Sequence, residues 1–182
     1  EGPDYVYAIS VQGHGAYPEE PVLEDPVIRV TKAETEEKKN QYEYYVNQLY
    51  EMDEFVEELI TAVSRREEDT VVVMYGDHLP TMGLKASDMK NGHLYSTEYF
   101  IWDNMGLEKV DKNLATYQMG AAVTERLGIH EGMMMQYHQR RLGTEYYMQD
   151  MEMLQYDLLY GKQYAFGESN PFEATDPQMG IR

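Results

Sequence analysis

The stretch from Val71 to His78 constrains the fold more than any other part of the chain. It reads Val-Val-Val-Met-Tyr-Gly-Asp-His, so an apolar and largely β-branched run leads directly into a glycine, a carboxylate and an imidazole. Such a run is typical of a buried strand. In open α/β sheets, ligands bind at the carboxyl ends of the strands. Asp77 and His78 are therefore predicted at the binding edge of a sheet.

A strand, a long helix and a second strand are predicted around this feature. Residues 5–11 are rich in β-forming side chains. Apolar and aromatic residues then recur in steps of three and four from Tyr42 to Val63, which predicts an amphipathic helix. This order is typical of a parallel sheet with a crossover helix. We expect an α/β fold with a mixed, mostly parallel sheet flanked by helices.

Shorter patterns predict the remaining elements. A brief strand is predicted at residues 27–30 and a further strand at 99–102. Helical spacing is found at residues 114–127, 133–137 and 147–158, and Gly128 stands where a helix end favours glycine. Residues 165–182 hold glycine, proline, serine and asparagine, so they are predicted to form an irregular tail.

The charge of the chain disfavours two kinds of partner. The net charge is −18 and the isoelectric point is about 4.5, so the surface repels nucleic acid and anionic membrane faces. An anionic substrate is still compatible, because a bound cation inverts the local field. No cysteine is present, which rules out disulfides and thiolate ligands. No apolar run reaches the ~18–20 residues that a membrane span needs.

Asp77 and His78 are the strongest candidates for chemistry. A carboxylate beside an imidazole suits a hard or borderline divalent cation such as Mn²⁺, Zn²⁺ or Mg²⁺. The ordinary structural explanation stays open: Asp77 would cap a turn and His78 would bond a backbone carbonyl. His14 follows the first predicted strand, so parallel neighbouring strands would place His14 and His78 at the same edge. A neutral imidazole binds metal, whereas an imidazolium holds a phosphoryl or sulfuryl oxygen.

The other histidines are weaker candidates. His93 lies in the loop after Asp77 and His78 and could complete a site there, although a solvent-exposed loop role is the simpler explanation. His130 and His138 flank a methionine-rich segment and are interpreted as structural. The three methionines at 133–135 are interpreted as core, because thioethers prefer Cu(I) to hard cations.

Several common catalytic motifs are absent from the sequence. It has no glycine-rich phosphate loop, no Gly-x-Ser-x-Gly and no His-Glu-x-x-His. Thr81 and Ser87 lie near the Asp-His pair in sequence only, so no serine or threonine stands at a convincing nucleophile position. The residues alone therefore indicate a metal-assisted reaction on an anionic ester, without its nucleophile.

Together these segments resemble a known family. Residues 9–18 read Ile-Ser-Val-Gln-Gly-His-Gly-Ala-Tyr-Pro, and a long helix separates them from Val-Met-Tyr-Gly-Asp-His at 73–78. This order is similar to the sulfatase-like catalytic domain of lipoteichoic acid synthases, which are phosphoglycerol transferases of the alkaline phosphatase superfamily. Later segments also fit, at residues 99–104, 127–129 and 154–162. The resemblance implies that residues 1–182 form the C-terminal part of that domain.

The resemblance also implies roles for individual residues. Asp77 and His78 would be ligands of a catalytic Mn²⁺, with Zn²⁺, Mg²⁺ and Ca²⁺ as the other cations considered. His14 would contact the phosphate of the glycerolphosphate group. The nucleophilic threonine and an acidic ligand would lie upstream of Glu1. Glu98 departs from the family pattern, in which proline is expected after Thr97, and this puts the local loop in question.

The implied activity is a phosphoglycerol transfer in the synthesis of a lipoteichoic acid-like polymer. The substrate would be a phosphatidylglycerol-type headgroup or polyglycerolphosphate, transferred through a covalent threonine intermediate. The other partner would be the N-terminal half of the domain, without which this part is expected to be inactive. The full-length protein would be anchored at the extracellular face of a bacterial membrane and would alone contact it.

Two alternatives remain open from the sequence. The first is a sulfatase, or a phosphatase or phosphodiesterase, of the same superfamily, which the identity of the nucleophile would distinguish. The second is a non-catalytic acidic surface module that binds Ca²⁺ or a protein partner. That module would tolerate replacement of Asp77 or His78, whereas an enzyme would not.

Overall fold

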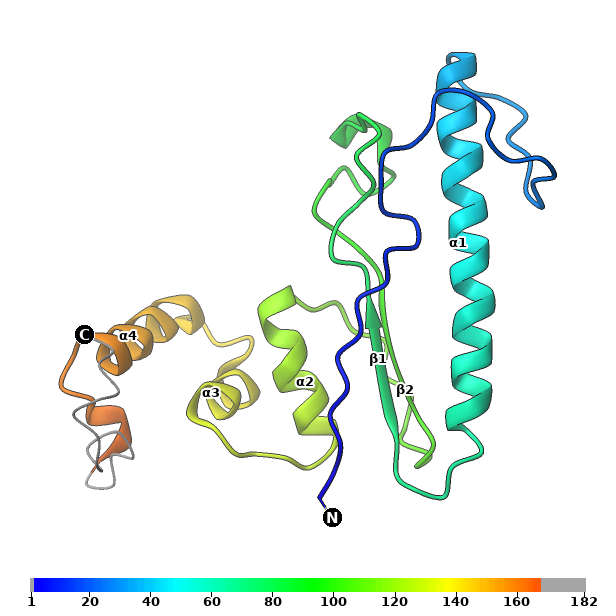
Figure 1. Ribbon diagram of the computed structural model, residues 1–182. Helices are drawn as coiled ribbons and strands as arrows, with labels where there is room; N and C mark the ends of the chain where they lie inside the picture. Colours follow the sequence, from blue (N-terminus) through cyan, green and yellow to red (C-terminus); the bar gives the residue numbers. More distant parts are fainter. Residues whose placement is uncertain (1, 168–182) are drawn as a thin grey trace, which may run out of the picture. The chain divides into compact units, whose positions relative to one another are not determined.

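The computed structural model describes residues 2–167, which fall into two compact units (Figure 1). The first unit ends at Glu108 and the second begins at Lys109. Most of the tail predicted at 165–182 lies outside the described residues, and its first two residues belong to a 3₁₀ turn, η3, at Tyr164–Phe166. Between residues 2 and 167, no helix has both the length and the apolar character needed to cross a membrane.

Helix α1 is the longest element of the first unit and spans Glu36–Val63. The Thr35 side chain caps it by accepting a hydrogen bond from the Lys38 N–H at 3.2 Å. Glu36 and Glu37 in the first turn favour the positive end of the helix dipole. These signals explain why the helix starts upstream of Tyr42, where the apolar periodicity predicted it to begin.

Strands β1, Val71–Tyr75, and β2, Tyr99–Asp103, form an antiparallel two-stranded sheet. Both strands were predicted, and their central pair is Val73 opposite Ile101. The predicted mostly parallel arrangement is not formed within residues 2–167. Asn104 completes one end of the sheet, because it exchanges hydrogen bonds with the Thr70 backbone at 2.7 and 3.2 Å.

The prediction of a strand at residues 5–11 is wrong for this structure. The segment is extended and runs alongside β1 in the same direction (Figure 1), yet no backbone hydrogen bond joins residues 2–11 to β1. The contact is made by side chains, with the Tyr7 and Tyr75 hydroxyls 3.3 Å apart. The residue types favour a strand, but β propensity is realised only when the backbone pairs with a neighbour.

The strand predicted at residues 27–30 is also absent, because α1 satisfies that backbone with side chains. The Asn47 amide, only 5% exposed, accepts from the Ile28 N–H at 3.0 Å and donates to the Ile28 carbonyl at 2.8 Å. Glu43 accepts from the Val30 N–H at 2.8 Å. A side-chain amide therefore supplies the pair of bonds that a neighbouring strand would otherwise make.

The second unit is helical, as the spacing predicted. Its described residues, 109–167, include the 3₁₀ turn η2 at Thr116–Gln118 and three α-helices, which are α2 at Met119–Arg126, α3 at Met133–Arg141 and α4 at Tyr147–Leu159. Gly128 follows α2 with a φ of +67°, which confirms its predicted place at a helix end. Its N–H and that of Ile129 bond back to Glu125 and Thr124, the pattern of a Schellman motif.

The core of the second unit is built around Tyr147, which is 7% exposed. Its ring stacks on Tyr137 with centroids 5.6 Å apart, and its hydroxyl lies 2.5 Å from Nδ1 of His138. His138 is itself buried, so its interpretation as a structural residue is confirmed. Met135, in contrast, is partly exposed, so the methionine segment is only in part core.

The buried imidazole makes the stability of the second unit depend on pH. Burial lowers the pKa of His138 below its usual 6.5, so the folded state favours the neutral ring. Below pH 6.5, His138 binds a proton more readily in the unfolded chain than in the folded protein. The free energy of unfolding is therefore expected to fall as the pH drops from 6.5 to the folded-state pKa. Urea denaturation between pH 5 and 7.5, compared with His138→Gln, measures this. An unchanged pH slope in His138→Gln would contradict the assignment.

Candidate functional site

Asp77 and His78 leave the sheet at the end of β1, where Gly76 is bonded to the opposite segment. The Gly76 N–H donates to the Glu98 carbonyl at 3.1 Å, and the Gly76 carbonyl accepts from the Thr97 hydroxyl at 2.6 Å. Glu98 uses only its carbonyl here, a group that proline also has. The departure from proline at this position therefore leaves the anchoring of the loop intact.

Each side chain of the Asp-His pair uses one atom for local structure and turns the other toward its neighbour. Asp77 Oδ1 accepts from the His78 backbone N–H at 2.9 Å, and His78 Nδ1 lies 2.9 Å from the Leu79 carbonyl. These are the bonds of the ordinary structural explanation. Asp77 Oδ2 and His78 Nε2 remain, 3.7 Å apart, on side chains that are 77% and 55% exposed.

The Leu79 carbonyl selects the tautomer of His78. A carbonyl only accepts, so Nδ1 must carry the proton and the neutral ring presents a lone pair at Nε2. Metal-binding histidines commonly donate their other N–H in this way. Two donors that each lie about 2.0–2.2 Å from one ion can be at most about 4.4 Å apart. The 3.7 Å separation of Oδ2 and Nε2 satisfies this limit, so the pair fits a divalent cation.

The pair alone does not provide enough ligands for a metal site. In the described part of the chain, no three histidine or acidic side chains converge as ligands for one ion. His93 therefore does not complete the pair, and its backbone N–H bonds to the Asn91 side chain at 3.0 Å instead. Because structural and catalytic zinc-type sites use three or four protein ligands, further ligands are needed.

His14 lies beside this pair, as the sequence predicted for the two histidines. The ring centroids of His14 and His78 are 6.1 Å apart and the rings meet edge to face. His14 ends a β-turn, closed by its N–H bonding to the Val11 carbonyl at 3.1 Å. Gly13 occupies the third position of the turn with a φ of +78°, which a type II turn requires there. The turn brings His14 to the edge although residues 5–11 form no strand.

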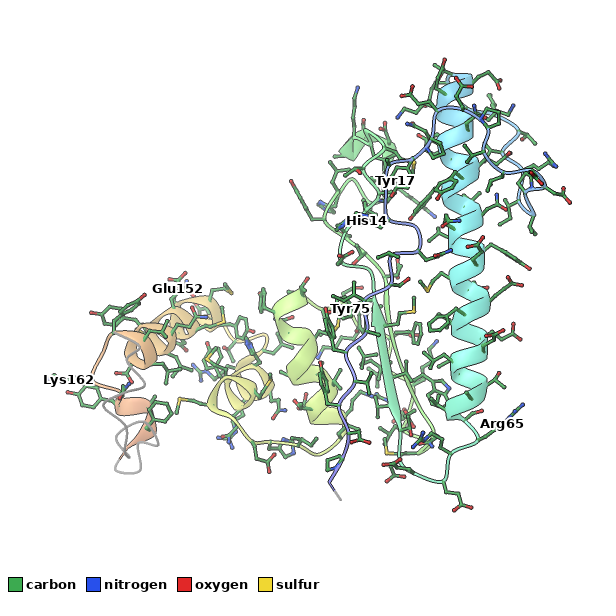
Figure 2. All side chains as sticks on the ribbon, viewed as in Figure 1. His14, Tyr17, Arg65, Tyr75, Glu152 and Lys162 are labelled. Carbon is green, nitrogen blue, oxygen red and sulfur yellow. The ribbon has the colours of Figure 1, made fainter. Side chains whose placement is uncertain are left out.

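Helix α1 holds the turn in place through residues that the sequence pattern did not single out. The Tyr17 hydroxyl donates to the Gly13 carbonyl at 2.7 Å, and Figure 2 shows Tyr17 next to His14. The Tyr17 ring packs edge to face on Tyr45 of α1, with centroids 5.7 Å apart. Burial raises the pKa of the Tyr17 hydroxyl, so it stays a donor at neutral pH. Gln12 also bonds to Glu51 of α1.

Comparison with protein families assigns most of the chain to a family. A family model described as Sulfatase matches residues 1–129, a range that includes His14, Asp77 and His78 and ends before α3. The comparison with curated proteins and the comparison with solved structures each return no match.

Proposed function

The chain belongs to the sulfatase family, and from this premise we propose that it is the C-terminal part of a metal-dependent phosphoglycerol transferase domain. The family assignment supports an α/β enzyme that acts on sulfate or phosphate esters. The observation that carries the finer proposal is the exposed Asp77–His78 pair with the His14 ring beside it. The resemblance to lipoteichoic acid synthases gives the substrate, a phosphatidylglycerol-type headgroup.

Each of the three residues has a distinct role in this proposal. Asp77 Oδ2 and His78 Nε2 would hold the cation, Mn²⁺ by preference, since a carboxylate and an imidazole suit it. His14, exposed at the same edge, would donate to a phosphate oxygen. When bound, the divalent ion polarises the ester and lowers the pKa of the attacking hydroxyl. The attacking residue is proposed to be a threonine upstream of Glu1.

The exposure of apolar side chains in the first unit supports a second half of the domain as partner. Tyr5, Ile9 and Val11 are 88%, 77% and 77% exposed, although such side chains usually pack inside a sheet. No side chain among the described residues is completely buried. A two-stranded sheet is only marginally stable alone. We propose that the other half pairs with residues 5–11 and completes the mostly parallel sheet.

The proposed location rests on the family resemblance and is compatible with the charge of the chain. Phosphatidylglycerol and polyglycerolphosphate are anionic, and the acidic surface of this chain does not favour contact with an anionic membrane. From the resemblance to lipoteichoic acid synthases, we propose that the domain works at the extracellular face of a bacterial membrane, with membrane contact through other segments of the full-length protein. The cation would compensate the charge between protein and headgroup.

Sulfate ester hydrolysis is the second candidate function, because the matching family model is described as Sulfatase. Assaying the intact, membrane-anchored enzyme with fluorescent phosphatidylglycerol and with an aryl sulfate, each with Mn²⁺ or with EDTA, separates the two. We expect metal-dependent release of diacylglycerol and no sulfate release. Release of sulfate without release of diacylglycerol would show that the enzyme is a sulfatase. Activity that survives both Asp77→Asn and His78→Ala would instead favour a non-catalytic role for this module.

A further inference from the structure

Thr97 takes the place of a backbone group where the sheet ends. The last pair of the β1–β2 ladder is Tyr75 opposite Tyr99, so Gly76 and Glu98 would form the next pair. Only one of the two expected backbone bonds is made, from the Gly76 N–H to Glu98. The Gly76 carbonyl accepts from the Thr97 hydroxyl instead, at 2.6 Å. A side chain therefore terminates the ladder one residue before Asp77.

The carbonyl that Thr97 holds lies in the same peptide plane as the Asp77 N–H. Because a peptide unit is planar and rigid, fixing that oxygen fixes the plane from which Asp77 begins. Asp77 Oδ1 accepts a hydrogen bond from the His78 backbone N–H, so the orientation of this peptide plane also affects the position of His78. Thr97 also packs closely here, since a Cβ placed on Gly76 would lie 3.4 Å from the Thr97 Cβ.

We propose that Thr97 is a positioning residue for the Asp77–His78 pair, acting through the Gly76 carbonyl. The inference rests on the proposed function, in which that pair binds a divalent cation. Removing the hydroxyl frees the Gly76–Asp77 peptide to rotate, so the distance between Asp77 Oδ2 and His78 Nε2 is no longer fixed. Part of the binding free energy of the ion is then used to order the two side chains, so the affinity of the pair for the ion falls.

The experiment compares three variants of the intact catalytic domain, in which the pair has its further ligands. Thr97→Val keeps the shape and removes the donor, whereas Thr97→Ser keeps the donor and removes a methyl group. Thr70→Val is the matched control, because the Thr70 hydroxyl also donates to a backbone carbonyl, that of Glu68 at 2.8 Å, near the opposite end of β1. Mn²⁺ binding is measured by electron paramagnetic resonance, stability by urea denaturation, and the metal-free Asp77 and His78 amides by NMR chemical shifts.

Thr97→Val is expected to bind Mn²⁺ about tenfold more weakly, the lower range for loss of a group that orients metal ligands. Thr97→Ser should bind like the wild type, and Thr70→Val should lose stability without losing affinity. In the metal-free protein, the Asp77 and His78 amide signals should move in Thr97→Val alone. Equal weakening in Thr97→Val and Thr70→Val would overturn the proposal, since it would show a general loss of folding.

The metal-free measurement separates this inference from the proposed function. If Asp77→Asn binds Mn²⁺ as well as the wild type does, the pair is not a metal site and the proposed function fails. The positioning role is then judged by the amide signals alone. Unchanged Asp77 and His78 signals in Thr97→Val would overturn it, with or without metal.

Discussion

Replacing Asp77 by asparagine is expected to lower the turnover of the intact enzyme by about a thousandfold. A catalytic divalent ion contributes several kcal/mol to the transition state, and about 1.4 kcal/mol corresponds to a factor of ten in rate. Asparagine has the same shape and still accepts the His78 N–H through Oδ1, so the local fold should persist. What it lacks is the negative charge at Oδ2, which faces His78 Nε2. Diacylglycerol release from phosphatidylglycerol measures the effect.

Asp88→Asn is the matched control for this prediction. Asp88 is also an exposed carboxylate that bonds a backbone N–H, that of Lys85 at 2.8 Å, but it faces no histidine among the described residues. Its replacement should leave turnover unchanged. A loss in Asp77→Asn no greater than that in Asp88→Asn would mean that the carboxylate charge at position 77 has no part in the reaction.

Replacing Asn47 by leucine is expected to destabilise the first unit by about 3 kcal/mol. A buried polar group left without its partner costs about 1–3 kcal/mol, and a leucine side chain here would leave both the N–H and the carbonyl of Ile28 without partners. The carbonyl of Glu43 would lose a donor as well. Urea denaturation followed by the fluorescence of Trp102, the single tryptophan of the chain, measures the loss.

Asn40→Leu serves as the comparison on the same helix. Asn40 also bonds a loop carbonyl, that of Glu19 at 2.6 Å, but it makes this one bond at the surface. Its loss should cost about 1 kcal/mol or less. Equal effects of the two substitutions would show that Asn47 is not the anchor of residues 27–30.

The parts of the fold that follow from local residue patterns could be predicted. Helix α1 and both strands were found where periodicity and β-branched runs placed them. Residues 5–11 and 27–30 were not, because a strand depends on a partner that its own sequence does not specify. For Ile28 and Val30 the partners are Asn47 and Glu43, whose polar side chains looked like an ordinary helix surface.

In the candidate site, too, only the residues that belong to strong local patterns could be predicted. Asp77, His78 and His14 could be selected as candidates because they follow segments with strong patterns, and the structure brings the two histidine rings close together. Thr97 could not, since a single threonine in a loop carries no periodic signal. Its role depends on the register of β1 with β2, which sets it opposite the end of β1.

Anomalous X-ray diffraction at the manganese edge, from crystals of the intact and active catalytic domain, would show directly where the ion binds. We expect a single strong peak within bonding distance of Asp77 Oδ2 and His78 Nε2, with His14 facing the phosphate of a bound glycerolphosphate. The Asp77→Asn crystals should lose or weaken that peak. A fully active domain whose metal lies away from both Asp77 and His78 would show that this pair is not the metal site.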